Sequence, residues 1–236
     1  MKILFIVKKL LNVIKKAYGV STGTIVLFIA CVSHNTFGQK HSIKPDLSDS
    51  SRFQLVNRAI AISADKQGKN IIHLDSNSNA GVAWINNLAF KKGIIEFDAK
   101  GKNILQQSFV GVAFHGLNDS TYEAIYFRPF NFLSHDTARS SHSVQYISLP
   151  QYDWPYLREK HPGKYENALI NKTDPESWFH VKLVVASENT AVYVNNDDRP
   201  SLVVKPLSNR TTGKTGFWVG NNSEGDFSNL SIQNKQ

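Results

Sequence analysis

The sequence predicts an all-β protein folded as a two-sheet antiparallel β-sandwich. Short apolar segments follow one another from Phe53 onward, separated by turn-forming residues such as Gly, Asn, Asp and Ser. Polarity alternates within these segments with a period of two, and no stretch shows a sustained helical period. A series of about a dozen short strands at close spacing favours two sheets packed against each other.

The first strand candidates start at Phe53, near Ile71 and at Gly81, and turn-forming residues bound each of them. The polar residues 39–51 that precede them predict a linker or a loosely held strand. We therefore expect the folded domain at residues 52–236.

Three strands between Gly93 and Phe132 provide the main functional candidates. Successive side chains of a strand point to opposite sides, so each strand has an apolar and a polar face. The apolar faces carry Ile95, Phe97 and Ala99, then Val110, Val112 and Phe114, then Ile125 and Phe127 with Glu123 in register. The opposite faces carry Glu96, Asp98 and Lys100, then His115, then Tyr122, Tyr126 and Arg128. If the three strands are neighbours, their polar faces form one patch.

Residues 151–171 interrupt the strand pattern. This segment, QYDWPYLREKHPGKYENALIN, is too long for a tight turn and is rich in Trp, Tyr, Pro and charged residues. Segments of this length are usually functional or disordered, so we expect a structured excursion over one face of a sheet. The alternative is a loop that only closes the end of the sandwich with Trp154 and Tyr156.

Charge and cysteine content limit the classes of function. The chain of 236 residues has a formal net charge of +8, and five lysines lie in the first 38 residues, which contain no Asp or Glu. Subtracting these five lysines leaves +3 for the rest, which is too mild to favour nucleic-acid binding. The only cysteine is Cys31, so the predicted domain has no thiol for a disulfide, a metal or nucleophilic catalysis.

The N-terminal region has the layout of a secretory signal peptide. Lysines extend to Lys16, an apolar run covers residues 24–32, and small residues follow up to Gly38. We expect residues 1–38 to be removed and the protein to be secreted or periplasmic. The apolar run is shorter than the ~20 residues of a spanning helix, so no membrane span is expected. Lipid attachment at Cys31 is the weaker alternative, because the residues before it fit that signal poorly.

The run from Trp178 to Ile232 reads as a closing series of hairpins, WFHVKLVVASENTAVYVNNDDRPSLVVKPL and then GKTGFWVGNNSEGDFSNLSI. It resembles the last strands of concanavalin A-like (laminin G-like) jelly rolls, which include legume lectins and glycoside hydrolase family 16. The segments YEAIYFRPFNF and VQYISLPQYDWPYLREKHPGKYE resemble secreted bacterial proteins labelled family 16 glycoside hydrolase or 3-keto-disaccharide hydrolase domain. The resemblance covers residues 53–232. It implies a jelly roll with a carbohydrate partner, although this fold also hosts protein-interaction modules.

The resemblance implies catalytic roles for Glu96 and Asp98. Family 16 hydrolases carry a strand of the type E-x-D-x-x-E or E-x-D-x-E, whose two glutamates are nucleophile and general acid. Here Glu96-Phe97-Asp98 matches the first half, and Lys100 or Gly101 replaces the second glutamate. The two-carboxylate mechanism therefore lacks its acid in the expected place.

A hydrolase of this kind would need a general acid from elsewhere. The available donors are Glu123, Glu166 and His115, and we favour Glu166 because the 151–171 segment can bring it over the sheet. Glu96 and Asp98 occupy adjacent positions on one strand face, where their carboxyl groups could lie near the ~5–5.5 Å separation of a retaining pair. A surface ladder of charges with Lys100 and Arg128 explains the same two residues without any function.

The remaining candidates would bind sugar. Aromatic side chains suit the apolar faces of pyranose rings, and a guanidinium offers a planar fork to a carboxylate or a pair of hydroxyls. Arg128 can instead serve as an internal clamp for Glu123, Glu166 or Asp153. The substrate-binding candidates are His115, Tyr126, Arg128, Asn131, Tyr146, Trp154 and Arg158.

No spacing of His, Cys and carboxylate residues predicts a transition-metal or EF-hand site, and we expect no cofactor. The superfamily implies at most a structural Ca²⁺, for which Asn221, Asn222 and Asp226 are weak candidates.

Together these patterns lead us to expect a secreted glycoside hydrolase-like domain that acts on a poly- or disaccharide at the concave sheet face. A non-catalytic, lectin-like carbohydrate-binding module and a laminin G-type protein-interaction module are the alternatives. The oligomeric state does not follow from the sequence.

The N-terminal layout makes a direct prediction about export. N-terminal sequencing of the exported protein should start at or near Gln39, because the small residues before it fit signal peptide cleavage. A soluble cytoplasmic protein that retains Met1 would contradict it, and a lipidated Cys31 would place the protein at a membrane surface.

Overall fold

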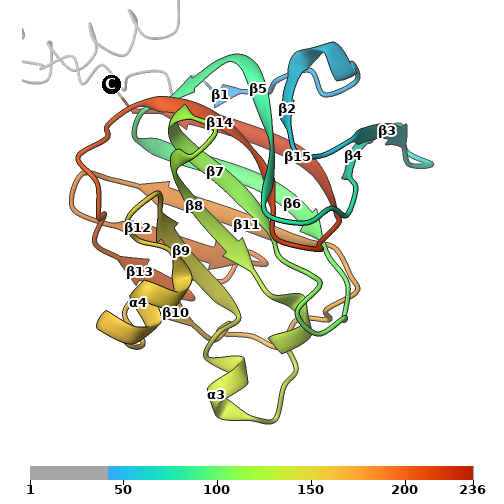
Figure 1. Cartoon of the computed structure of the whole chain (residues 1–236). Coiled ribbons are helices and arrows are strands. Elements are labelled where there is room, and N and C mark those ends of the chain that lie inside the picture. The colour runs from blue at the N-terminus through green and yellow to red at the C-terminus, as the bar shows by residue number, and fades with distance from the viewer. Residues whose placement is uncertain (1–41, 236) are drawn as a thin grey trace, which may run out of the picture. The chain divides into compact units, whose positions relative to one another are not determined.

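The computed structural model describes residues 42–235 and confirms a sandwich of two antiparallel sheets (Figure 1). The predicted signal peptide and Cys31 lie outside these residues. Sheet A contains, in spatial order, β13 (Leu202–Val204), β12 (Thr190–Val194), β11 (Phe179–Val185), β6 (Gly93–Lys100), β15 (Gly225–Asn234), β4 (Asn70–Leu74) and β3 (Ile60–Ala64), with β1 (Ser42–Ile43) paired to β15. Sheet B contains β10 (Glu166–Asn167), β9 (Val144–Ser148), β8 (Thr121–Phe127), β7 (Val110–Asn118), β14 (Gly213–Val219), β5 (Gly81–Phe90) and β2 (Phe53–Val56).

The segment before residue 52 contributes to the sandwich. β1 pairs with β15 so that Ser42 lies opposite Gln233, and the 3-10 helix η1 (Ser50–Arg52) is capped by the Asp49 side chain. Leu47, between these two elements, is buried in the core. Residues 42–51 thus contain a short strand and a 3-10 helix that precede the predicted domain.

The core lies between the sheets and consists of apolar side chains from alternate strand positions. Phe97 of β6 and Phe217 of β14 meet across it, and Phe217 stacks on Phe227 of β15 with ring centroids 4.6 Å apart. Alternation predicted the inward positions of β6 and β8 correctly, because Ile95, Phe97, Ala99, Ile125 and Phe127 are all fully buried.

Sheet B is also buried on its outer face, which antiparallel sheets commonly leave exposed to water. A second apolar layer covers this face, and its buried members include Trp84, Tyr122, Tyr126, Ile147 and Trp218. Leu157 of the helix α4 (Trp154–Lys160) packs into the same layer and is itself buried. In Figure 1, α4 lies beside β9 and β10. Residues 151–171 therefore form the predicted structured excursion over a sheet face.

The helices of this fold are too short to show a helical period in the sequence. Within residues 42–235 they are η1, η2 (Pro129–Asn131), α3 (Thr137–Ser140) and α4. The start of α4 nevertheless carries a recognisable signal, because Asp153 caps the helix and accepts a hydrogen bond from the Trp154 N–H, and Pro155 lies in the first turn.

The outer layer of sheet B requires β7 and β8 to approach closely at Gly111. Tyr126 and Trp218 flank Gly111 in neighbouring strands, and their rings meet with centroids 4.7 Å apart. A Cβ at position 111 would lie 2.1 Å from the Ile125 carbonyl oxygen and 2.6 Å from the Tyr126 Cα.

We predict that Gly111→Ala lowers the free energy of unfolding by about 1–3 kcal/mol, because the strands must move apart to admit a methyl group. Urea unfolding measures this loss. Gly163→Ala is the comparison, since a Cβ there meets no atom within 4 Å, although its φ of +69° adds some backbone strain. If Gly111→Ala has the same free energy of unfolding as the wild type, the two strands are not tightly apposed at this position.

Candidate functional site

Nine of the ten candidate residues fall into three groups rather than one patch, and Asn131 lies beside the third group. β6 pairs with β11 and β15 in sheet A, whereas β7, β8 and β9 are neighbours in sheet B. The expectation that β6, β7 and β8 are adjacent is therefore wrong. Alternation defines the two faces of a strand, but it carries no information on which strand pairs with which.

The first group, Glu96 and Asp98, lies on the outer face of sheet A. Asp98 accepts hydrogen bonds from Lys69 Nζ at 2.9 Å, His180 Nδ1 at 2.8 Å and Asn229 Nδ2 at 2.7 Å. Burial alone would raise the pKa of Asp98, but these hydrogen bonds lower it to about 2. The Asp98 carboxylate in turn raises the pKa of His180. Asp98 therefore belongs to a surface ladder of charges, the alternative without function that the sequence allowed. Its partners are Lys69 and His180, whereas the sequence suggested Lys100 and Arg128.

The second group, His115 and Tyr146, lies on the inner side of sheet B. A bulge follows Phe114 in β7, and His115 has a φ of +50°, so its side chain turns to the face that Phe114 occupies. Its ring stacks on Phe90 of the core. Tyr146 faces inward because it lies opposite Ile125 in β8. The expectation that His115 shares a face with Tyr126 is therefore wrong.

Both side chains converge on the buried Glu123. Tyr146 Oη and Ser208 Oγ each donate to Glu123 at 2.6 Å, and His115 Nδ1 lies 3.1 Å from it. The second ring nitrogen of His115 faces the Lys91 carbonyl oxygen. Burial favours a raised pKa for Glu123, but His115, Ser208 and Tyr146 lower it below the usual value. Glu123 is thus a carboxylate with three protein partners.

The third group forms a connected network at the α4 side of sheet B. We name it the α4 cluster, and it contains Tyr126, Arg128, His142, Gln145, Trp154, Arg158 and Glu166. Arg158 Nε and Nη2 donate to the two carboxylate oxygens of Glu166 at 3.0 and 2.7 Å. His142 Nδ1 lies 2.8 Å and Arg128 Nη1 lies 3.8 Å from Glu166 Oε2.

Arg128 connects this carboxylate to the outer face of sheet B. Its guanidinium donates to the His142 carbonyl at 2.8 Å, to Tyr126 Oη at 2.9 Å and to Gln145 Oε1 at 3.3 Å. Asn131 Nδ2 lies 3.5 Å from the same carbonyl oxygen. The buried Arg128 therefore acts as the internal clamp that the sequence offered as one of its two roles.

The charges of the α4 cluster hold Glu166 in its ionised form. Burial by itself would raise the pKa of Glu166, but the hydrogen bonds and charge of Arg158, with His142 and Arg128, lower it. Burial, together with the two guanidinium groups, lowers the pKa of His142 although Glu166 opposes this shift. Burial raises the pKa of Tyr126 to about 12, so it remains a neutral phenol. Glu166 is a poor proton donor near neutral pH.

Solvent reaches the α4 cluster mainly at Trp154 and Arg158. Trp154 is 42% exposed, and the Arg158 side chain is 36% exposed. The guanidinium carbon of Arg158 lies 5.0 Å from the centre of the Trp154 ring. Tyr126, by contrast, is only 2% exposed and belongs to the apolar layer on the outer face of sheet B.

Sequence reasoning missed three contributors to these sites. His142 lies just before β9, and Gln145 lies within it. Trp218 of β14 packs against Tyr126 on the outer face of sheet B. The alternation of side chains in β9 places Gln145 on the face opposite Tyr146. This pattern could have been used to assign Gln145 to the face that carries Tyr126. Nothing in the sequence around His142 indicates its contact with Glu166.

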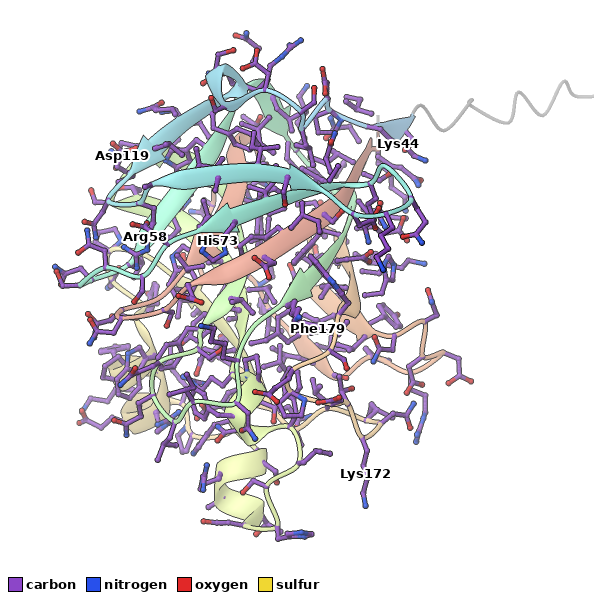
Figure 2. All side chains as sticks on the ribbon, turned by 90° about the vertical axis from the view of Figure 1, so that its right-hand side faces the viewer. Lys44, Arg58, His73, Asp119, Lys172 and Phe179 are labelled. Carbon is purple, nitrogen blue, oxygen red and sulfur yellow. The ribbon has the colours of Figure 1, made fainter. Side chains whose placement is uncertain are left out.

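The weak Ca²⁺ candidates have other partners. Asp226 Oδ1 lies 2.7 Å from Nδ1 of His73, which Figure 2 labels on β4, and Asn221 accepts a hydrogen bond from the Asn79 N–H. Across residues 42–235, no group of three or more His, Cys, Asp or Glu residues is arranged to hold a metal ion. In the same part of the chain, no helix is long and apolar enough to cross a membrane.

Comparisons with known proteins establish the fold. No family model and no curated protein matches the chain. The structure is similar to carbohydrate-binding module CBM66 from Bacillus subtilis, with a TM-score of 0.51 and 11% identity over 76% of this chain and 97% of that one. A Bacillus subtilis protein of unknown function with a galectin-like fold has a TM-score of 0.52 and 14% identity over 80% and 91% of the two chains.

A third similar structure is the metal-free exoplasmic/lumenal domain of VIP36, with a TM-score of 0.50 and 11% identity over 84% of this chain and 93% of that one. At such identities the similarity concerns the fold. The chain has a concanavalin A-like jelly-roll fold, which confirms the fold that the sequence resemblance implied.

The Asp98 network predicts a specific pH dependence of stability. Because the pKa of Asp98 is lowered in the folded protein, the carboxylate stabilises the folded state at pH values above about 4, near its pKa in the unfolded chain. This stabilisation is lost as the pH falls toward about 2. We expect Asp98→Asn to lower the free energy of unfolding at pH 7 by about 1–2 kcal/mol, after allowance for solvent screening.

Urea unfolding of both proteins between pH 7 and pH 2 tests this expectation, and the difference between them should shrink below about pH 4. Glu96→Gln is the control on the same strand face, since Glu96 has no hydrogen bond or ion pair with any side chain in the described range. A difference that stays constant down to pH 2 would refute the assignment.

Proposed function

We propose that this protein is a secreted, non-catalytic carbohydrate-binding protein of lectin-like type, and that sugar binds on the surface formed by Trp154 and Arg158. The observation that carries the proposal is the exposed Trp154 ring beside a guanidinium that Glu166 holds at two points. The similarity in fold to a carbohydrate-binding module and to a protein with a galectin-like fold supports the same class.

The arrangement suits a sugar for physical reasons. An indole ring offers a rigid apolar platform for the C–H face of a pyranose, and it loses little conformational freedom on binding. Arg158 contributes planar N–H donors whose orientation is already fixed by Glu166, so little side-chain entropy is lost when a hydroxyl group is bound. Because α4 is packed on sheet B through Leu157, the ring and the guanidinium form a rigid pair.

Hydrolysis by the predicted carboxylates is less consistent with the geometry. A glycosidase needs two carboxyl groups within roughly 5–9.5 Å of each other on either side of the scissile bond. Glu96 and Asp98 lie on the outer face of sheet A, and Glu166 lies at the α4 side of sheet B. Stacked sheets are about 10 Å apart, so Glu166 cannot act on one bond together with Glu96 or Asp98. Glu96 and Asp98 share one strand face, but Lys69, His180 and Asn229 already hold the Asp98 carboxylate. Glu166 is also ionised and bound to Arg158.

Substitution of Trp154 tests the proposal. A glycan array first identifies the best ligand of the wild-type protein, and calorimetry then measures its affinity. We expect Trp154→Ala to weaken binding roughly tenfold or more, because the stacking surface is lost, and to leave the melting temperature nearly unchanged. Tyr126→Ala is unsuitable for this purpose, because Tyr126 is buried against Trp218 and its loss would destabilise the fold.

Trp178→Ala is the matched control. It removes an indole near the outer face of sheet A, where Trp178 contacts Lys69, and it should leave the affinity unchanged. Equal affinity of wild type and Trp154→Ala would place the sugar elsewhere. Release of reducing ends from the bound glycan would show that the protein is an enzyme.

A further inference from the structure

A second candidate site lies at one end of the sandwich. A cleft of about 530 Å³ opens between the β5–β6 turn, the end of β11 and the loop from β13 to β14. Its volume falls in the range of small-molecule sites. Glu123 and His115 lie in its wall, and none of the α4 cluster residues lines it.

The charge of the cleft is positive. Lys91, Lys92 and Arg210 line it, and within residues 42–235 none of the three has an acidic ion-pair partner. Glu123 is the one carboxylate in the lining, and His115, Tyr146 and Ser208 already occupy it. Three cations around a partly enclosed space attract an anion, because the low-dielectric walls reduce screening.

Arg210 is positioned before any ligand arrives. Its Nη2 donates to Ser148 Oγ at 2.9 Å and its Nη1 lies 3.5 Å from the Leu149 carbonyl oxygen. Its Nε is buried and has no hydrogen-bond partner in the described structure. The contacts of the two Nη atoms hold the guanidinium in place in the wall of the cleft.

The rest of the lining matches a polyhydroxylated ring. Side chains with hydroxyl or amide groups, among them Ser187, Asn209 and Thr212, alternate with small apolar surfaces at Val185 and Pro206. Hydroxyl and amide groups can bond sugar hydroxyls, and the apolar patches can contact ring C–H groups. Neither feature is required by a simple inorganic anion.

We propose that the cleft binds an acidic saccharide, with the carboxylate of a uronic acid held by Arg210, Lys91 and Lys92. The saccharide part of this inference rests on the proposed function, whereas the anionic part rests on the cleft alone. The cleft site is separate from the Trp154 surface. The two sites therefore bind either different parts of one saccharide chain or two different ligands.

The experiment is a calorimetric titration of the 39–236 protein with disaccharides that contain galacturonate, glucuronate, mannuronate or iduronate. Neutral digalactose and sodium sulfate are the two comparison ligands. We expect at least one uronate to bind, with an affinity that falls as salt is added, and we expect the double variant Lys91→Gln/Lys92→Gln to bind it roughly tenfold more weakly. Both lysine side chains are exposed, so the variant should fold normally.

Lys66→Gln/Lys172→Gln is the matched control, because it removes the same charge from two exposed lysines that do not line the cleft; Figure 2 labels Lys172. Its affinity should equal that of the wild type. Uronate binding that is unchanged in Lys91→Gln/Lys92→Gln, equal binding of digalactose, or the absence of binding to all four uronates would overturn the proposal. Sulfate binding as tightly as the best uronate would overturn its saccharide part.

Trp154→Ala separates this proposal from the proposed function. It should bind the uronate as the wild type does, because Trp154 does not line the cleft. Loss of uronate binding in Trp154→Ala, with full binding retained in Lys91→Gln/Lys92→Gln, would support the Trp154 surface and refute the cleft.

Discussion

The packing of Leu157 on the outer face of sheet B is the contact on which the proposed binding surface depends. Leu157 is 1% exposed, and burial of one leucine side chain contributes about 1.5–3 kcal/mol. That contribution keeps α4 against Ile147, Tyr126 and their neighbours, although a helix of seven residues is too short to be stable alone. The position of Trp154 and Arg158 therefore follows from the apolar burial of a nearby side chain on the same helix.

The ionic contacts of the α4 cluster add orientation to this packing. β10 has two residues, and its pairing with β9 places Glu166 opposite Gln145, within reach of both Arg158 and Arg128. One carboxylate between two guanidinium groups is a partly buried arrangement, whose attraction is offset by the desolvation of the charges. Its main effect is to fix directions. Arg158 is held beside the Trp154 ring, and Arg128 is held over Tyr126.

The sequence was sufficient to predict the fold and the faces of the regular strand segments. Alternation placed Ile125 and Phe127 inward and Tyr126 and Arg128 outward, because the pleat of a strand enforces a period of two. It failed at His115, where a bulge adds residues to one strand and reverses the face. It also grouped Glu96 with Tyr126, because strand pairing depends on long-range contacts that a local pattern does not encode. The role of Asp98 in an ion network with Lys69 and His180 required the same long-range information.

The pairing of β1 with β15 has a consequence for the order of the strands along the chain. Ser42 lies opposite Gln233, so the described body starts and finishes at neighbouring positions of sheet A. A short peptide joining these two points would close the backbone into a ring and leave every strand pairing in place. New termini could then be opened in an exposed turn such as the one at Gly68, where a Cβ would meet no atom within 4 Å. The strand pairings of this jelly roll are therefore compatible with a circular backbone, because the two ends of the described chain meet at the β1–β15 pair.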